Sequence, residues 1–380
     1  MNSQTLLRCM AALALASLLG ACTQKNTGDD QSQAAGASAD IAFGIDRFLL
    51  FPNPIGTDPF AQNGGAFETA DTAYAAAYYR AIDPGNTEDT IDKWRALNGF
   101  TGYAVPARPG TEHLAVFRDV KDLGYGRRMT ARRNSDDTSI AFYVENYNVA
   151  PGGSPSYSST LNVDAAIRRD TQWHVGTNAI EWTATLCAPG FDPADCDPTV
   201  KFAKYYNFSS ADGTRQLAVD LDGQGLKAMP GPCITCHGGR GDPLTPPDAS
   251  GKPRFPLVEN SLSRKRGDVQ ARLHGQNVDS FGYSSSQAGF AKSDQQAFLK
   301  DFNQWIVCTY PSAIPATVTG GWGTCTRPTA GANEWQGTAA EMIQSWYGGP
   351  GMPAATFSDT YVPAGWNTNT PIAGTTFTDT

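Results

Sequence analysis

Between residues 112 and 221, apolar and polar positions alternate with a period of two in six separate runs. Alternation of this kind, with β-branched and aromatic residues, is typical of β-strands. Short connections rich in Gly, Asn, Asp and Pro separate the runs, which favours antiparallel pairing. The predicted strands cover residues 113–117, 129–133, 139–147, 178–186, 200–208 and 216–221.

On either side of this region the apolar residues recur at helical spacing. Two helices are predicted before the strands, at 69–82 and 87–97, and three after them, at 262–274, 293–307 and 338–347. The sequence therefore predicts an α+β fold. Its length suggests two domains. We expect a β-rich N-terminal accessory domain at 41–225 and a mainly α-helical domain at 226–380.

The first 22 residues predict export from the cytoplasm. Arg8 precedes an apolar run that is too short to span a bilayer as a stable helix. The run ends in Leu-Gly-Ala-Cys22, which resembles the bacterial lipobox and implies a lipid anchor on Cys22. An ordinary secretory signal or a short anchor is the alternative. The next residue is Thr rather than Asp, which implies an outer-membrane lipoprotein that faces the periplasm or the surface. Residues 23–40 are small and polar and predict a flexible tether.

The formal net charge is −8, and removal of a signal peptide whose one charged residue is Arg8 would make it −9. Such a surface disfavours nucleic acid as a partner, because the phosphate backbone repels it. A partner protein that presents a basic patch is the expectation instead.

The most informative motif is Cys233-Ile-Thr-Cys236-His237. Two thiols on one tight turn can add to the two vinyl groups of one porphyrin, and the adjacent histidine is carried under the iron. A redox disulfide or half of a zinc site is the alternative, but the chain has no second CxxC or HxxxH pair. The motif resembles that of c-type cytochromes. The resemblance implies one covalent haem c on Cys233 and Cys236, with His237 as the proximal iron ligand.

The chain has eight cysteines. Cys9 leaves with the signal peptide, Cys22 is assigned to lipid, and two cysteines are assigned to haem. Four remain in two local pairs, and an even remainder in an oxidising compartment predicts disulfides. From proximity in the sequence, we predict the pairs Cys187–Cys196 and Cys308–Cys325.

The distal iron ligand has several candidates. Met352 lies in Gly-Pro-Gly-Met-Pro-Ala, which resembles the loop by which class I cytochromes present a thioether to the iron, and it is the preferred candidate. His274 is the alternative, and another residue or an open site is the third possibility. Methionine ligation raises the reduction potential, whereas an open site permits ligand or peroxide chemistry.

The resemblance implies single-electron transfer in the cell envelope, by a monohaem cytochrome with a cytochrome c-like C-terminal domain. No nucleophile or general base stands in a recognisable catalytic pattern. Two other functions stay open. One is a haem-dependent oxidoreductase, either peroxidase-like or using the haem as an electron outlet. The other is an envelope binding or adhesion module.

Overall fold

The computed structural model describes residues 72–120, 123–150, 160–188, 196–197, 199–223, 225–242, 244–245, 251–252, 254–257, 263–310 and 338–360. The signal peptide, Cys22, the tether and Cys325 lie outside these residues, so the expectations placed on them stay predictions. Among the described residues, no helix combines the length and the apolar character that crossing a bilayer requires.

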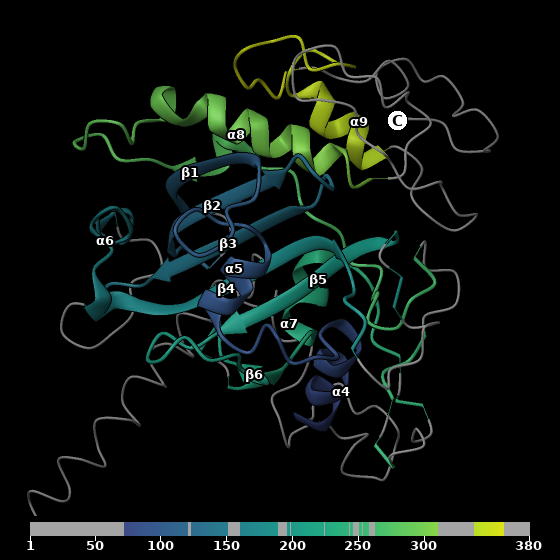
Figure 1. Cartoon of the computed structure of the whole chain (residues 1–380). Coiled ribbons are helices and arrows are strands. Elements are labelled where there is room, and N and C mark those ends of the chain that lie inside the picture. The colour runs from purple at the N-terminus through teal and green to yellow at the C-terminus, as the bar shows by residue number, and fades with distance from the viewer. Residues whose placement is uncertain are drawn as a thin grey trace, which may run out of the picture.

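A six-stranded antiparallel sheet forms the centre of the molecule, with the strand order β5-β4-β3-β2-β1-β8 (Figure 1). The α+β prediction is confirmed at this level, and the first five strands fall where the alternation predicted them. The strands are β1 (Gly110–Asp119), β2 (Gly126–Asn134), β3 (Ile140–Tyr147), β4 (His174–Ala184), β5 (Lys201–Phe208) and β8 (Phe281–Gly282). A separate two-stranded ribbon pairs β6 (Ala218–Val219) with β7 (Lys227–Ala228).

The helices among the described residues are α4 (Thr72–Ile82), α5 (Ile91–Leu97), α6 (Leu161–Arg168), α7 (Gly231–His237), α8 (Lys292–Val307) and α9 (Thr338–Ser345). Short 3-10 turns, Thr171–Trp173 and Val278–Ser280, precede β4 and β8. The helices predicted at 69–82, 87–97, 293–307 and 338–347 are confirmed in position, whereas α6 was not predicted.

Helices cover both faces of the sheet, which is why every residue of β3 is buried. Successive strand residues point to opposite faces. Phe142 of β3 makes an edge contact with Phe302 of α8, with ring centroids 5.7 Å apart, and the next residue, Tyr143, contacts Trp94 of α5 at 6.4 Å. The sheet is therefore the middle layer between α8 and α5 (Figure 1).

Side chains from helices satisfy backbone groups on both outer long strands. On β1, the amide of Gln295 from α8 accepts from the N–H of Val116 (2.5 Å) and donates to its carbonyl (2.9 Å). On β5, the N–H of Tyr205 donates to the hydroxyl of Tyr78 from α4 (3.0 Å). Buried backbone groups need such partners. These bonds attach α8 to β1 and α4 to β5, near the two opposite edges of the sheet.

One apolar cluster contains residues from both sides of the domain boundary predicted at 225/226. Tyr205 and Phe208 of β5 belong to it, as do Phe302 of α8 and Tyr347 after α9. The short strand β8 also pairs with β1 through Arg118 and Gly282. Cys233 and Ile234 of the predicted haem motif pack against this same cluster. The two-domain division stays a prediction.

Candidate functional site

The motif residues lie on α7, which ends at Gly238 with a φ of 69°. In a helix, residues three and four positions apart share a face. Cys233, Cys236 and His237 therefore lie on one side of α7, and all three are half-buried. Both cysteines are thiols. The helix thus presents two thiols and one imidazole together.

The orientation of His237 is fixed by a backbone carbonyl. Its ring nitrogen Nδ1 lies 2.8 Å from the carbonyl oxygen of Arg272. A carbonyl oxygen can only accept a hydrogen bond, so Nδ1 carries the proton and Nε2 keeps its lone pair. Burial lowers the pKa of His237 to about 3, with a further contribution from nearby His274. The imidazole is therefore neutral at physiological pH and offers Nε2 as a ligand, held as ligating histidines usually are.

The segment that carries Arg272 runs alongside the residues that follow α7. The N–H of Arg272 donates to the carbonyl of His237 (3.0 Å), and the N–H of Arg240 donates to the carbonyl of Val269 (2.9 Å). Gly239 permits this approach, because a Cβ there would lie 2.3 Å from the Val269 oxygen. These contacts place the Arg272 carbonyl at the imidazole.

The helix predicted for 262–274 is wrong. Residues 263–274 are described and contain turns and bends but no helix. Charged and apolar residues are buried together here, Asp268 and Arg272 as well as Val269, Ala271 and Leu273. The backbone groups that a helix would pair internally bond to the motif segment instead, so tertiary pairing overrides the local amphipathic pattern.

Strand β5 places the aromatic ring of Tyr205 beside the motif. The ring of Tyr205 lies 5.1 Å from that of His237, centroid to centroid, at an interplanar angle of 48°. Its hydroxyl is fully buried and has no hydrogen-bond partner among the described residues. Burial, with a contribution from Cys233, raises the pKa of Tyr205 well above its usual value, so the phenol keeps its proton. An orphaned buried donor is costly, and it is accounted for if another polar group completes the site.

These features fit a covalently attached haem. The two thiols and Nε2 of a neutral imidazole are the groups that attachment and iron ligation need, and they share one helical face. The ring of Tyr205 lies beside them, and its hydroxyl has no hydrogen-bond partner among the described residues. Sequence reasoning missed Tyr205 and the Arg272 carbonyl, because neither carries a local motif and both reach the site through tertiary packing.

The two candidate distal ligands lie in different settings. His274 is exposed, and its ring lies 4.6 Å from that of His237, tilted by 37°. Met352 is 1% exposed, follows α9 with a φ of 51°, and belongs to the apolar core. Its N–H donates to the carbonyl of Gly349 (2.9 Å). The contacts of Met352 are those of a core residue, so the identity of the distal ligand stays a prediction.

One of the two predicted disulfides is confirmed. Cys187 and Cys196 are bonded, with a Cα–Cα distance of 5.3 Å. Cys308 is also disulfide-bonded. Its predicted partner, Cys325, lies outside the described residues, so that pairing stays a prediction.

No protein-family model matches the chain, and no match was found among curated proteins or solved structures. The functional argument therefore depends on the residues and geometry of this chain.

Proposed function

We propose that the protein binds one haem c covalently and transfers single electrons in the cell envelope. One observation carries this proposal. His237 lies on the same helix as two thiols, and its Nδ1 donates a hydrogen bond to the Arg272 carbonyl. Each thiol of Cys233 and Cys236 would add across one vinyl group, and Nε2 of His237 would bind the iron. The haem supplies one-electron chemistry when bound.

The chain's own residues would set the properties of the site. The Arg272 carbonyl orients the imidazole and increases its basicity. Burial keeps His237 neutral, so protons do not compete for Nε2. The Tyr205 hydroxyl would donate to the haem or to a group at its edge, which lowers the cost of burying it.

For the distal side we favour Met352 over His274. The rings of His237 and His274 lie 4.6 Å apart, centroid to centroid, and are tilted by 37°, so they contact each other and leave no room for a group between them. His274 also follows Arg272 by two residues, and the Arg272 carbonyl holds Nδ1 of His237, which is not the nitrogen that would bind the iron. His274 is therefore a flanking residue in this proposal.

The ligand assignment is tested by spectra of the oxidised protein. Met352→Ala should remove the weak far-red band that marks iron–sulfur ligation, while His274→Ala should retain it. Loss of ligation in His274→Ala alone would move the assignment to the histidine.

Haem attachment is tested with a pyridine haemochrome assay on protein made in cells with working cytochrome maturation. The wild type should contain one haem that resists extraction, and Cys233→Ala/Cys236→Ala should contain none. Thr235→Ser, on the same helix between the cysteines, is the matched control and should retain haem. Extractable haem in the wild type would refute covalent attachment.

We also propose that a lipid on Cys22 anchors the protein in the outer membrane and that its redox partner presents a basic patch. The support is the N-terminal pattern and the net charge of −8. Labelling with a radioactive fatty acid should be lost in Cys22→Ala. Electron transfer to a basic partner should slow as ionic strength rises.

A haem-dependent oxidoreductase is the second candidate. It follows if neither Met352 nor His274 binds the iron, because an open iron position permits ligand or peroxide chemistry. Ready binding of carbon monoxide or cyanide by a high-spin haem would support this alternative, and a ligand-resistant low-spin haem would support the electron carrier.

A further inference from the structure

A polar cavity of about 210 Å³ lies between the C-terminal ends of α4 and α5 and the strands β4 and β5. It holds the space of roughly seven waters at ~30 Å³ each. Its floor is made of buried polar side chains that the haem proposal does not use. They include Asp83, Glu88, Asn98, Glu181 and Lys204.

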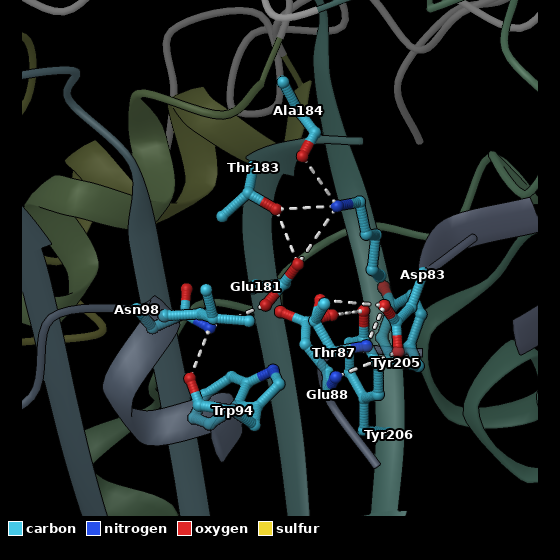
Figure 2. Close-up of polar contacts among 12 residues, drawn as sticks. Asp83, Thr87, Glu88, Trp94, Asn98, Glu181, Thr183, Ala184, Tyr205 and Tyr206 are labelled. Carbon is cyan, nitrogen blue, oxygen red and sulfur yellow. Dashed lines mark hydrogen bonds and ion pairs between the residues drawn. The ribbon is translucent and has the colours of Figure 1, made fainter. Parts of the chain in front are cut away.

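Glu181 and Lys204 form the centre of this floor. The Lys204 ammonium donates to Glu181 Oε1 (3.1 Å), to Thr183 Oγ1 (2.9 Å) and to the Ala184 carbonyl (2.8 Å). The other carboxylate oxygen, Oε2, accepts from Nδ2 of Asn98 at 2.7 Å (Figure 2). Burial acts to raise the pKa of Glu181, but the charge of Lys204 and these hydrogen bonds outweigh it and lower that pKa. Glu181 is therefore an ionised acceptor.

Glu88 is a second buried carboxyl group on the same floor, 7% exposed. The hydroxyl of Tyr206 donates to its Oε2 (Figure 2). Burial and then the negative charge of Glu181 raise the pKa of Glu88 well above its ordinary value. Burial and Glu181 thus favour the protonated form of Glu88, which can donate, while Lys204 favours the ionised form of Glu181, which can only accept.

Stability does not explain this arrangement. Replacing a buried ion pair by apolar residues of similar volume is often neutral or stabilising. The Glu181–Lys204 ion pair lines a cavity, so it is not closely packed as residues of an apolar core are. The Lys204 donors are all used within the protein, so a ligand in the cavity would hydrogen-bond to the acceptor positions left on the carboxyl groups of Glu181 and Glu88.

The charges around the cavity define the class of ligand. With Glu88 neutral, three acidic side chains face three basic ones, so the lining has no net charge. The acids are Asp83, Asp137 and Glu181, and the bases are Arg108, Lys201 and Lys204. Among the described residues, no group of three or more acidic, histidine or cysteine side chains is placed to hold a metal ion.

We propose that this cavity binds a neutral, hydroxyl-rich small molecule of monosaccharide size. Each hydroxyl group can donate to the carboxylate oxygens of the floor and can accept from a protonated Glu88. The exposed side chains of Leu97 and Leu186 form apolar edges at the mouth, against which the C–H face of a sugar can pack. This site does not depend on haem.

The proposal is tested by calorimetric titration of the purified full-length protein with D-glucose, D-xylose and myo-inositol, with D-glucuronate and glucose 6-phosphate as charged comparisons. We expect saturable binding of at least one neutral probe and weaker binding of the charged ones. No saturable binding of any neutral probe overturns the proposal, and preference for a charged probe overturns the ligand class.

Two variants locate the binding. Leu186→Trp should block the mouth without altering the buried floor, because Leu186 is 60% exposed, and should weaken binding by roughly tenfold or more. Leu226→Trp, at a comparably exposed leucine outside the cavity, is the matched control. Glu181→Gln/Lys204→Met should abolish binding. Wild-type affinity in both the Leu186 and the double variant contradicts the site.

Discussion

The backbone crossing at Gly239 gives the sharpest mutational test of how the fold builds the haem-motif site. Gly239 has a φ of 103°, and a Cβ there would lie 2.3 Å from the Val269 oxygen and 2.8 Å from the Ala271 nitrogen. Gly239→Ala must push this segment away, and with it the Arg272 carbonyl that orients the proximal histidine.

The neighbouring Gly238 provides a matched control. Its φ of 69° is also positive, but a Cβ there meets nothing within 4 Å. Both alanine substitutions put a side chain at a positive φ, which costs on the order of 1–3 kcal/mol. Gly239→Ala adds overpacking of about 1–3 kcal/mol. At about 2–4 °C per kcal/mol, its Tm should be roughly 2–12 °C below that of Gly238→Ala.

The assay combines thermal unfolding followed by circular dichroism with the fraction of protein that carries haem. We expect Gly239→Ala to have the lower Tm and the lower haem content, because its His237 loses the carbonyl that fixes the ring. Equal Tm values and equal haem content in the two variants would refute the close approach and the positioning role assigned to this segment.

Three further predictions concern buried polar groups. Because the pKa of His237 falls from about 6.5 unfolded to about 3 folded, haem-free protein should lose stability as the pH drops below about 6.5, by at most ~1.4 kcal/mol per pH unit. His237→Asn should flatten this slope in urea unfolding measured across pH, and an unchanged slope contradicts the assignment. Tyr205→Phe removes an orphaned hydroxyl, so it should stabilise haem-free protein by about 1–3 kcal/mol and stabilise the haem-loaded protein less. Equal effects in both forms would count against contact with haem. Glu181→Gln alone should cost ~3–5 kcal/mol in denaturant unfolding, and adding Lys204→Met should recover most of that loss. Additive losses would show that the pair is not coupled.

The sheet could be predicted because its signal is local. The strands β1 to β5 are each eight residues or longer and coincide with runs predicted from the sequence, and short connections join β1 to β2 and β2 to β3, so pattern and turn chemistry agree there. The helix α6 was missed because it is only eight residues long and buries Asn162, Ala165 and Ala166, which give a weak apolar pattern. Its position depends on tertiary contact, since a Cβ on Gly126 would lie 1.8 Å from the Asn162 carbonyl oxygen.

The candidate site divides in the same way. The motif of α7 is five consecutive residues with a chemical reason for their spacing, and sequence alone identifies it. The Arg272 carbonyl is 35 residues away from His237, and a backbone group has no sequence signature. The polar cavity is lined by Glu88 from the loop between α4 and α5, by Glu181 of β4 and by Lys204 of β5. None of these residues belongs to a motif. Only the folded chain brings them together.

The most direct test of the central claim is mass spectrometry of the peptide that contains residues 233–237, from protein made in cells with functional cytochrome maturation. The account predicts that this peptide carries the mass of one haem and that neither cysteine reacts with a thiol reagent. A peptide without haem, with both thiols reactive or joined to each other, would contradict it.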